Sequence, residues 1–402
     1  MKVLIVNTSK RTGGAAIAAN RLANALRQQG VEVSMLTRKD NFSFPNPFSH
    51  PRGSWWGALE RLRIFIANGL SKKRLWYVDI ACCGEDITRT REFQEADVIH
   101  LHYINQGFLS LDVIDKILRS GKRVIWTMHD MWPFTAICHH ADDCTCFQSH
   151  CHDCPLLVRP SAKDLSYKVF EKKQRVWQHG RITFVGCSKW IAERARKSAL
   201  TEGHRVVSIP NVVPHETFHP MPKDEARALF GLPTDKRLLL FSCQKVSDER
   251  KGMAYMLEAL ELLKNENIAL VVAGSEANIT TELPIYTTGY IADEQRMAAL
   301  YAAVDTFVTP SLQENLPNTI AEAMSCGTPC VGFHIGGIPE MIHHKEDGYV
   351  ARYRDAHDLA EGIRYVLSHP ELSATAAKHA QETYNEHQVA KLYIAEYRES
   401  LN

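Results

Sequence analysis

The stretch DTFVTPSLQENLPNTIAEAMSCGTPCVGFH, residues 305–334, contains the pattern that decides the fold. A short apolar run at 305–310 is followed by an amphipathic stretch from about Pro317 and by a second apolar run at 329–334. This alternation is typical of buried parallel strands joined by a crossover helix. Two glutamates are notable: Glu314 lies just before the predicted helix, and Glu322 lies about two turns inside it. Chance alone could place them there, because Glu is common in the first turns of helices.

The same alternation runs through the whole chain. Apolar runs that predict strands lie at 2–7, 31–37, 97–103, 123–128, 182–188 and 204–210, and again at 237–243, 268–274, 285–290, 305–310 and 329–334. A polar stretch rich in proline, residues 210–224, separates the two series and reads as a linker. We therefore predict an α/β protein of two doubly wound domains, residues 1–212 and 222–380. The last stretch, 381–402, is an amphipathic helix that we expect to pack back on the first domain.

The composition of the chain limits the kinds of partner that we expect it to bind. The chain has 402 residues, 45% of them hydrophobic and 23% charged, with a formal net charge of +1. Such a balance gives no global field to attract nucleic acid, and we expect no nucleic-acid partner. The sequence has no apolar run of 18 residues and opens directly on a strand, so we expect a cytoplasmic protein. In that compartment the 11 cysteines are not expected to form a disulfide framework.

Ligands of open parallel sheets bind beyond the carboxyl ends of the strands, at helix N-termini. Pro317 suits the first helical position, and the amides of residues 315–318 then face an anion. Glu314 can reach hydroxyls beside that anion, and Glu322 can accept two hydroxyls from a ribose. Sugar, diphosphate and ribose in this order describe a nucleotide-sugar.

A diphosphate also needs cations. The segment CQKVSDERKGM, residues 243–253, provides Lys245 and Lys251 after a predicted strand, and Gly252 lets the backbone turn into the next helix. The two lysines can neutralise a leaving diphosphate without a metal. The alternative is that both are solvated surface lysines, and we assign Arg250 to the surface.

At this point a resemblance becomes specific. The segment LQENLPNTIAEAMSCGTPCVGFHIGGIPEMI, residues 312–342, resembles the signature of the large retaining glycosyltransferase family 4, with its Glu-x7-Glu motif at Glu314 and Glu322. KVSDERKG (245–252) looks like the basic pair of that family, although an arginine is usual at the position of Lys245. VVAGS (271–275) is similar to its nucleobase-side turn, IPNVVPHETFHP (209–220) to its linker motif, and DGYVARYRDAHDLAEGI (347–363) to its closing segment.

The resemblance implies a GT-B fold, in which two Rossmann-like domains face a central cleft and the second binds the donor, a UDP- or GDP-sugar. It also implies transfer with retention of configuration and no catalytic metal. Glu314 then binds the transferred sugar and Glu322 the ribose, while a role of Glu314 as covalent nucleophile stays open. The donor-binding residues that the resemblance implies are Gly13, Gly14, Lys245, Lys251, Gly274, Glu314, Asn315, Leu316 and Glu322.

Two features of the first domain face the same predicted cleft. Gly13 and Gly14 follow the first strand at a helix N-terminus, where the resemblance places them against an acceptor or donor phosphate; a tight turn is the alternative. His129 ends a strand, and the matching histidine of the family contacts the transferred sugar or serves the acceptor side. Asp130 could orient it, and a histidine that satisfies local backbone is the alternative. Together with Glu314, Lys245 and Lys251, His129 forms the predicted catalytic set.

A cysteine-rich insertion follows at 136–156. Cys138, Cys144, Cys151 and Cys154 have the spacing C-x5-C-x6-C-x2-C, in which the last two form a knuckle typical of zinc sites. The insertion looks like that of colanic-acid and capsule sugar transferases within the family. We predict a structural zinc, with free thiols or a redox site as alternatives. Spare candidate ligands are Cys146, His139, His140, His150 and His152.

Residues 54–78 combine aromatic and basic side chains on a helical pattern. The aromatic residues are Trp55, Trp56, Trp76 and Tyr77, and the basic ones are Arg61, Arg63, Lys72, Lys73 and Arg74. Such a segment suits a peripheral membrane contact or a lipid-linked acceptor, and an ordinary capping helix is the alternative.

These observations predict a retaining transferase that moves a sugar from a nucleotide donor to a lipid-linked saccharide or a growing surface polysaccharide such as capsule, exopolysaccharide or O-antigen. It would act in the cytoplasm, at the cytoplasmic face of the inner membrane. A nucleotide-sugar epimerase of the same fold and a noncatalytic nucleotide-sugar-binding module are the alternatives.

Overall fold

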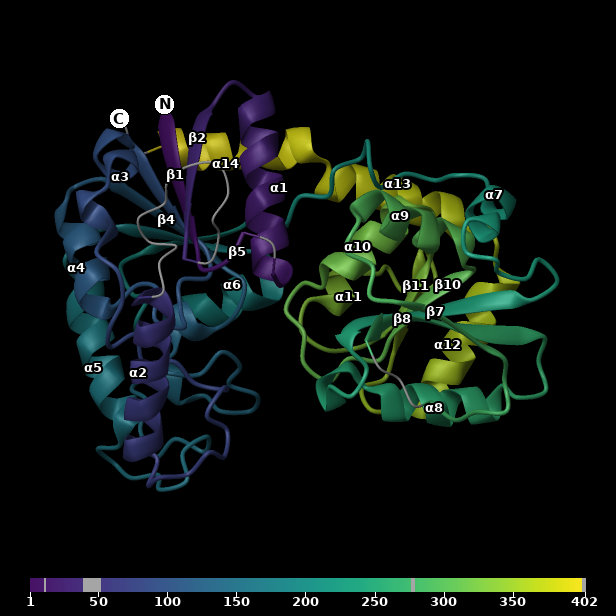
Figure 1. Ribbon diagram of the computed structural model, residues 1–402, viewed down its shortest axis with the longest axis horizontal. Coiled ribbons are helices and arrows are strands. Elements are labelled where there is room, and N and C mark those ends of the chain that lie inside the picture. The colour runs from purple at the N-terminus through teal and green to yellow at the C-terminus, as the bar shows by residue number, and fades with distance from the viewer. Residues whose placement is uncertain (11, 39–51, 276–278, 400–402) are drawn as a thin grey trace. The chain divides into compact units, whose positions relative to one another are not determined.

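The computed structural model describes residues 1–10, 12–38, 52–275 and 279–399, and within these ranges the chain forms two parallel sheets of six strands each (Figure 1). The chain divides into two compact units. The first unit consists of Met1–Pro210 and Val389–Asn402, and the second of Asn211–Gln388. Both are doubly wound α/β units, as the alternation of apolar runs and helical patterns predicts.

The first unit has the strand order β2-β1-β3-β4-β5-β6. Its strands are β1 (Lys2–Asn7), β2 (Glu32–Thr37), β3 (Val98–Leu101), β4 (Arg123–Met128), β5 (Ile182–Gly186) and β6 (Arg205–Ser208). Its helices are α1 (Gly14–Gln28), α2 (Arg52–Ala67), α3 (Arg91–Glu95), α4 (Leu111–Arg119), α5 (Leu165–Trp177), α6 (Lys189–Arg196) and most of α14 (Glu386–Arg398). Short 3-10 turns lie at Ile87–Arg89, Trp132–Phe134 and Cys146–Gln148.

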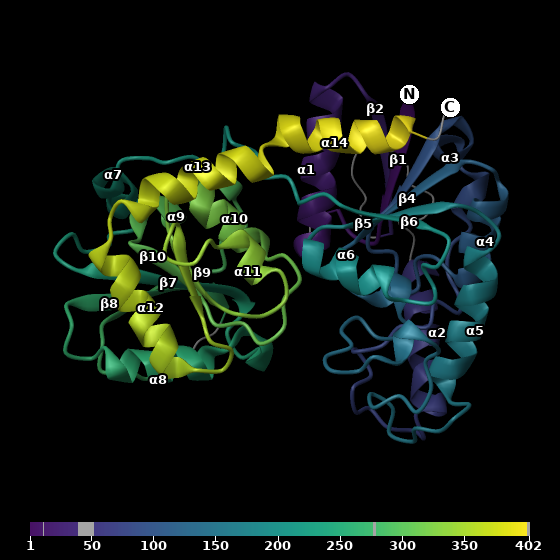
Figure 2. The same ribbon diagram turned by 180° about the vertical axis from the view of Figure 1, so that it is seen from behind.

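Both faces of this sheet are covered. On one face, Leu4, Ile99 and Trp126 join the apolar core together with residues of α4 and α5. On the opposite face, α14 lies against the strands, as Figure 2 shows. Its Tyr397 hydroxyl lies 2.7 Å from Nδ1 of His100, and its Tyr393 hydroxyl lies 2.9 Å from the hydroxyl of Thr127.

The second unit has the strand order β12-β11-β10-β7-β8-β9. Its strands are β7 (Arg237–Lys245), β8 (Ile268–Ser275), β9 (Ile285–Gly289), β10 (Thr306–Thr309), β11 (Cys330–Phe333) and β12 (Gly348–Ala351). Its helices are α7 (Lys223–Ala228), α8 (Met253–Leu262), α9 (Glu294–Ala303), α10 (Asn318–Ser325), α11 (Ile338–Met341), α12 (Ala356–Ser368) and α13 (Leu372–Tyr384), with a 3-10 turn at Glu249–Lys251.

Alternate side chains of β7 belong to two different apolar cores, one on each face of the sheet. Leu238 and Leu240 join one core with residues of α9, α10 and α13, whereas Leu239 and Phe241 join another with residues of α8 and α12. Figure 1 shows these two groups of helices on opposite sides of the sheet. Side chains of a strand point to alternate faces, so a strand that is apolar at every position must be covered on both.

All the strands predicted from apolar runs are present, and β12 is one more that was not predicted as a strand. The helix expected from about Pro317 begins at Asn318, with Pro317 as its N-cap. The C-terminal stretch differs more from its prediction. The helix expected over 381–402 is divided, because α13 continues to Tyr384 and α14 begins only at Glu386.

Candidate functional site

The strand order of the second unit reverses between β7 and β10, which are neighbours although they lie far apart in the chain. At such a switch point the loops after the two strands leave in opposite directions and leave room for a ligand. Lys245 and Lys251 follow β7, and Glu314 follows β10. The topology therefore brings together the residues that the sequence singled out for the donor site.

Lys251 and Glu314 are in direct contact. The ammonium nitrogen of Lys251 lies 2.5 Å from Oε1 of Glu314, and the side chains are 35% and 13% exposed. The negative charge of Glu314 raises the pKa of Lys251, against the opposing effect of burial. Lys251 therefore carries its charge at neutral pH with no phosphate present, and the pair offers a cation beside an acceptor of hydrogen bonds.

Two glycines shape the loop that carries Glu314. A Cβ on Gly336 would lie 1.8 Å from the carbonyl oxygen of Glu314, and a Cβ on Gly252 would lie 1.8 Å from that of Pro310. Both glycines also have positive φ, 57° and 73°. The amide of Gly337 donates to the carbonyl of Asn315 at 2.7 Å. The Gly-Gly turn at Gly336 and Gly337 thus packs directly on the backbone of Glu314, the predicted sugar-binding residue.

Glu322 lies further along α10 and is 6% exposed. Its carboxylate accepts a hydrogen bond of 3.1 Å from the hydroxyl of Tyr301, a buried residue of α9. Burial and the charge of Glu322 raise the pKa of that hydroxyl, so it stays protonated and donates. Tyr301 is a positioning residue that the sequence did not suggest, because only the packing of α9 on α10 brings it to Glu322.

The other predicted donor-binding residues of the second unit lie on the same strands and loops or on the neighbouring β8. Lys245 is the last residue of β7 and is exposed, and its carbonyl accepts from the amide of Asp248 in the turn that leads to Lys251. Gly274, in β8, lies so near the carbonyl of Cys243 that a Cβ would come within 2.3 Å of it. Asn315 is buried, and Leu316 packs on the apolar core. The guanidinium of Arg250 is paired with Asp248 at the surface.

In the first unit the strand order reverses between β1 and β3. Gly13 is the N-cap of α1 and has a φ of 92°, which favours glycine, and Gly14 is the first residue of the helix. Both are exposed. The structure thus gives this unit an accessible helix N-terminus at its switch point.

His129 follows β4, and its Nε2 lies 2.9 Å from Nδ1 of His102. Burial lowers the pKa of His129 to about 4 and that of His102 well below its usual value. Two neutral imidazoles share one hydrogen bond, so the tautomers of His102 and His129 are coupled. His102 is a second residue that the sequence left unassigned.

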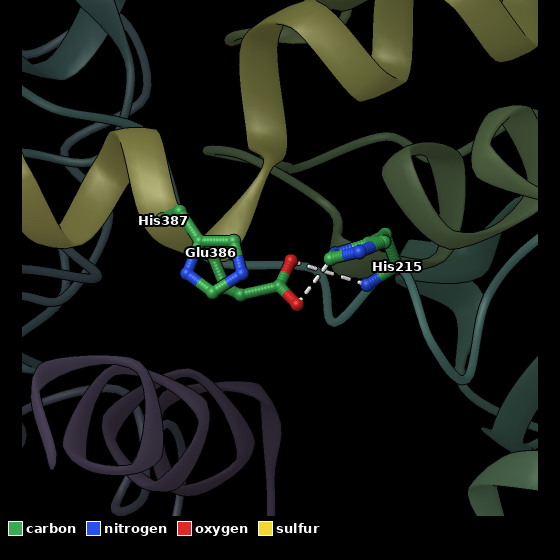
Figure 3. A group of neighbouring side chains, drawn as sticks. All are labelled: His215, Glu386 and His387. Carbon is green, nitrogen blue, oxygen red and sulfur yellow. Dashed lines mark hydrogen bonds and ion pairs between the residues drawn. The ribbon is translucent and has the colours of Figure 1, made fainter. Parts of the chain in front are cut away.

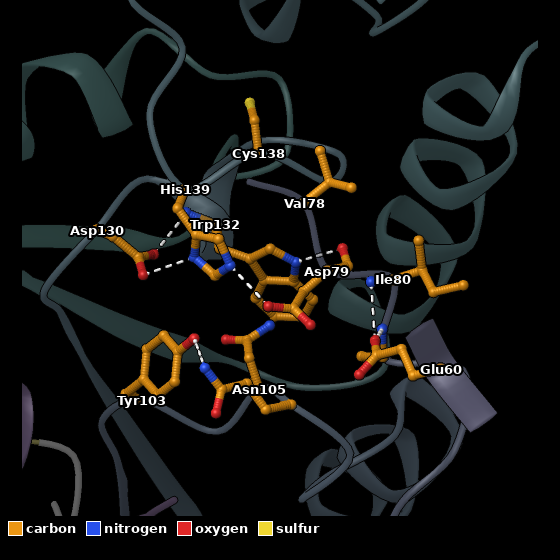
Figure 4. A network of polar contacts seen from close by, with 12 residues as sticks. Glu60, Val78, Asp79, Ile80, Tyr103, Asn105, Asp130, Trp132, Cys138 and His139 are labelled. Carbon is orange, nitrogen blue, oxygen red and sulfur yellow. Dashed lines mark hydrogen bonds and ion pairs between the residues drawn. The ribbon is translucent and has the colours of Figure 1, made fainter. Parts of the chain in front are cut away.

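Asp130, expected as the partner of His129, is engaged with another histidine. Its Oδ2 lies 2.7 Å from Nδ1 of His139, and its Oδ1 accepts from the amide of Trp132 at 2.8 Å. Nε2 of His139 lies 2.7 Å from Oδ2 of Asp79, so the imidazole lies between two carboxylates, as Figure 4 shows. Arg61 pairs with the other oxygen of Asp79.

This network joins α2 to the loop after β4. Glu60 of α2 accepts from the amides of Ile80 and Ala81 at 2.9 and 2.6 Å, next to Asp79. Both nitrogens of His139 are used here, and Nε2 of His150 lies 3.0 Å from Glu171. These two spare candidates for a metal therefore already have partners.

The described chain includes every cysteine of the sequence, and each is a free thiol. Cys151 and Cys154 are buried, and Cys138 and Cys144 are half-buried. Burial raises the pKa of Cys151, and the nearby sulfurs of Cys138, Cys144 and Cys154 raise it further. Among the described residues, two groups of three side chains have candidate ligand atoms mutually within 4.8 Å, and neither includes a cysteine.

An exposed apolar patch lies on α2 and the loops beside it. Its large side chains are Leu62, Ile66, Leu70, Trp76, Tyr77 and Val158. The amide of Val158 donates to Asn68 at 2.6 Å, which joins the two parts of the patch. The side chain of Trp55 lies outside the described residues. No helix of the described ranges has both the length and the apolar character needed to cross a bilayer.

Comparison with known proteins agrees with this architecture. The Glycosyltransferase Family 4 profile matches residues 12–217, and the profile of glycosyl transferases group 1 matches residues 236–369. A D-inositol 3-phosphate glycosyltransferase of Pseudarthrobacter chlorophenolicus is 24% identical over 92% of this chain and 87% of its own length. An N,N'-diacetylbacillosaminyl-diphospho-undecaprenol alpha-1,3-N-acetylgalactosaminyltransferase of Campylobacter jejuni is 29% identical over 37% of this chain and 41% of its own.

Solved structures show the same fold. Sucrose-phosphate synthase of Thermosynechococcus elongatus has a TM-score of 0.68 at 18% identity and covers 100% of this chain and 99% of its own. HepE of Anabaena, solved in complex with UDP, has a TM-score of 0.60 at 15% identity, with both chains covered fully.

The two doubly wound units and their likeness to these solved structures give the chain a GT-B fold. The chain belongs to Glycosyltransferase Family 4.

Proposed function

We propose that this protein is a retaining hexosyltransferase that moves a sugar from a nucleoside-diphosphate sugar to a lipid-linked saccharide or a growing surface polysaccharide. One observation carries the proposal: the Lys251–Glu314 pair lies at the switch point of the second unit, and Glu322 follows on α10. Together these residues supply the three groups that such a donor requires: a cation for the diphosphate, an acceptor for sugar hydroxyls and an acceptor for ribose hydroxyls.

In the proposed reaction the protein mainly stabilises charge. Lys251 and Lys245 neutralise the departing diphosphate, and the amides of Asn315 and Leu316 add hydrogen bonds. Glu314 binds the hydroxyls of the transferred sugar, and its charge favours a sugar that becomes cationic as the bond to phosphate breaks. His129, neutral at pH 7, serves as a hydrogen-bonding group on the acceptor side rather than as a cation.

We choose the donor and the acceptor to be tested from what similar proteins bind or act on. The Anabaena protein was solved with UDP, and the name of the Campylobacter enzyme describes a diphospho-undecaprenol acceptor. We propose a UDP-sugar as the first donor to test, with a GDP-sugar as the second, and a polyprenyl-diphosphate saccharide as acceptor.

The test is a turnover assay with purified protein, UDP- and GDP-sugars, and polyprenyl-diphosphate saccharides. Release of nucleoside diphosphate that depends on acceptor, with the anomeric configuration of the donor kept in the product, supports the proposal. Epimerised donor without acceptor would instead identify an epimerase. Binding without turnover, for every donor and acceptor pair, would identify a noncatalytic module.

We also propose that the exposed apolar patch touches an anionic membrane at the cytoplasmic face, where a lipid-linked acceptor resides. Trp76 is 70% and Leu70 66% exposed. Between Arg61 and Val78 the sequence has five basic residues and no acidic one. Apolar side chains flanked by lysines and arginines are typical of segments that lie in the membrane interface.

Vesicle flotation tests this contact. Wild-type protein should float with phosphatidylglycerol vesicles and less with phosphatidylcholine, and the double variant Ile66→Ser, Trp76→Ser should bind at least about tenfold more weakly, because about 3 kcal/mol of apolar transfer is lost. Leu229→Ser, an equally exposed apolar residue of the second unit, is the control. Equal flotation of the double variant and the wild type would contradict the contact.

A structural zinc at Cys138, Cys144, Cys151 and Cys154 is a further part of the proposal. Four thiolates would close a tetrahedral site and stiffen the insertion beside His129. Cys138, Cys144 and Cys154 lie near enough to Cys151 to raise its pKa, although no three of the described cysteines have sulfurs mutually within 4.8 Å, so an ion would have to draw them together. Metal analysis should find one zinc equivalent more in the wild type than in Cys151→Ser, and purified wild-type protein without zinc would exclude it.

A further inference from the structure

His215, Glu386 and His387 form a compact group in the second unit. Figure 3 shows the carboxylate of Glu386 pointing at His215, with the ring of His387 beside it. Oε1 of Glu386 lies 2.6 Å from Nδ1 of His215, and its Oε2 accepts from the His215 amide at 3.2 Å. One candidate ligand atom from each of the three residues lies within 4.8 Å of the other two.

Two details concern the charge balance of Glu386 and the hydrogen bonding of His215. Glu386 is 4% exposed, and among the described residues no lysine or arginine comes within 4.0 Å of its carboxylate. Nδ1 of His215 is a buried nitrogen without a hydrogen bond, since its close approach to Oε1 does not have hydrogen-bond geometry. A buried carboxylate is costly unless a cation accompanies it.

The positions of the three ligands are fixed by backbone contacts that need no ion. The amide of Val213 donates to the carbonyl of Tyr384 at 3.0 Å, and Val213 pairs with Asn385 in an isolated parallel bridge. These contacts join the segment just after Pro210 to the start of α14. Both are places where the chain passes from one unit to the other.

The angle between the two imidazole planes distinguishes this group from the second group of candidate ligands, which also contains two histidines. In His343, Asp347 and His379 the two imidazoles are stacked, with ring centres 4.0 Å apart and planes inclined by 11°. A coordinated ion must lie near the plane of each imidazole, and two parallel planes share no such point. The rings of His215 and His387 are inclined by 63° with centres 5.7 Å apart. Two imidazoles on one tetrahedral zinc, at about 2.0–2.1 Å each, have centres about 5 Å apart.

We propose that His215, Glu386 and His387 bind a divalent transition metal ion, and that zinc is the ion they select. Two imidazoles and one carboxylate are ligands that zinc prefers, and three protein ligands leave its fourth position to water. The ion fastens residue 215 to residues 386 and 387, and so stiffens the two segments by which the chain passes between its units. The site is independent of the cysteines and of the transfer reaction.

The experiment titrates zinc into full-length protein that has been treated with a chelator, with a competing chromophoric chelator as readout. Wild type should bind one equivalent more than His215→Gln or His387→Gln, or bind it at least about tenfold more tightly, as expected for the loss of a ligand. His343→Gln, from the stacked cluster, should bind zinc as the wild type does. Any zinc bound at the cysteines would be the same in the wild type and in every variant, so it would not affect the difference in bound zinc between them.

Cobalt supplies a second readout, because a site without sulfur gives ligand-field bands but no sulfur-to-metal charge-transfer band. Each variant should lose only the ligand-field bands assigned to this site. Both histidines are only partly buried, so the circular dichroism of the variants should match that of the wild type. If His215→Gln and His387→Gln both bind zinc and cobalt as the wild type does, the proposal is wrong.

Discussion

At the scale of single residues, the candidate donor site depends on side chains that position other side chains. Glu322 presents its carboxylate because Tyr301 donates to one of its oxygens, and Lys251 keeps its charge because Glu314 lies beside it. The sequence identified Glu314, Glu322 and Lys251 by motif and spacing. It did not identify Tyr301 or His102, because each is distant in the chain and is brought to its partner only by tertiary packing.

Substitution of Glu322 should weaken binding of the donor more than it slows turnover. Glu322→Ala removes charged hydrogen bonds of about 1.5–3 kcal/mol each, so the Kd should rise at least about tenfold. Tyr301→Phe removes one neutral donor worth about 1 kcal/mol and should raise the Kd about fivefold. Glu314→Ala should mainly lower kcat. Titration calorimetry and steady-state kinetics measure these changes.

The control is Tyr365→Phe, which removes an exposed hydroxyl bound to the carbonyl of Lys345 in the same unit. Near-normal binding and kinetics for both glutamate variants would contradict the assignment.

Two histidines that the fold keeps neutral, His100 and His129, make stability depend on pH. Burial lowers the pKa of His129 to about 4 and that of His100 to about 3, both below the usual value near 6.5. Below pH 6.5 the unfolded chain binds protons that the folded chain does not, so stability is full above that pH and falls as the pH drops toward 4. Each histidine contributes a loss of at most about 1.4 kcal/mol per pH unit.

Thermal unfolding between pH 7.5 and 4.5 checks this dependence. His129→Gln should show a shallower fall in Tm than the wild type, because one of the contributing groups is absent. An equally steep fall in the variant would show that His129 is not held neutral by the fold.

At the scale of elements, glycine turns determine where the ligand-facing loops lie. Gly336→Ala should displace the Glu314 backbone, because its Cβ would meet a carbonyl oxygen at 1.8 Å in addition to the positive φ. Gly231 has a similar φ of 61° but open space around its Cβ. We expect Gly231→Ala to cost about 1–2 kcal/mol of unfolding free energy and Gly336→Ala about 2 kcal/mol more.

Denaturant unfolding and donor binding distinguish the two variants. Only Gly336→Ala should also weaken donor binding. Equal stability and equal affinity in both would show that the Gly-Gly turn does not support Glu314.

The elements themselves were largely predictable. Continuous apolar runs identified the strands because those strands are covered on both faces. The strand at Gly348–Ala351 was not predicted, because GYVA lies between charged residues and does not extend into a longer apolar run. The division of the C-terminal stretch at Asn385 was missed as well, since the amphipathic pattern of α13 leads almost directly into that of α14.

At the scale of the whole molecule, we propose that the second unit binds most of the donor and that the first unit serves the acceptor. The first unit has the exposed glycines of α1, the neutral His129 and the apolar patch on α2. The sequence could not specify UDP or GDP, because the residues that face the nucleobase are determined by loop conformation rather than by a motif. A thermal-shift screen of nucleotide-sugars should give the largest rise in Tm for the true donor.

The most direct test of the central claim is a crystal structure of the protein with that donor bound. We predict that the diphosphate lies within hydrogen-bonding distance of the Lys251 ammonium and the amides of Asn315 and Leu316, with the ribose hydroxyls on Glu322. A nucleotide bound to the first unit, or anywhere away from residues 245–322, would contradict it.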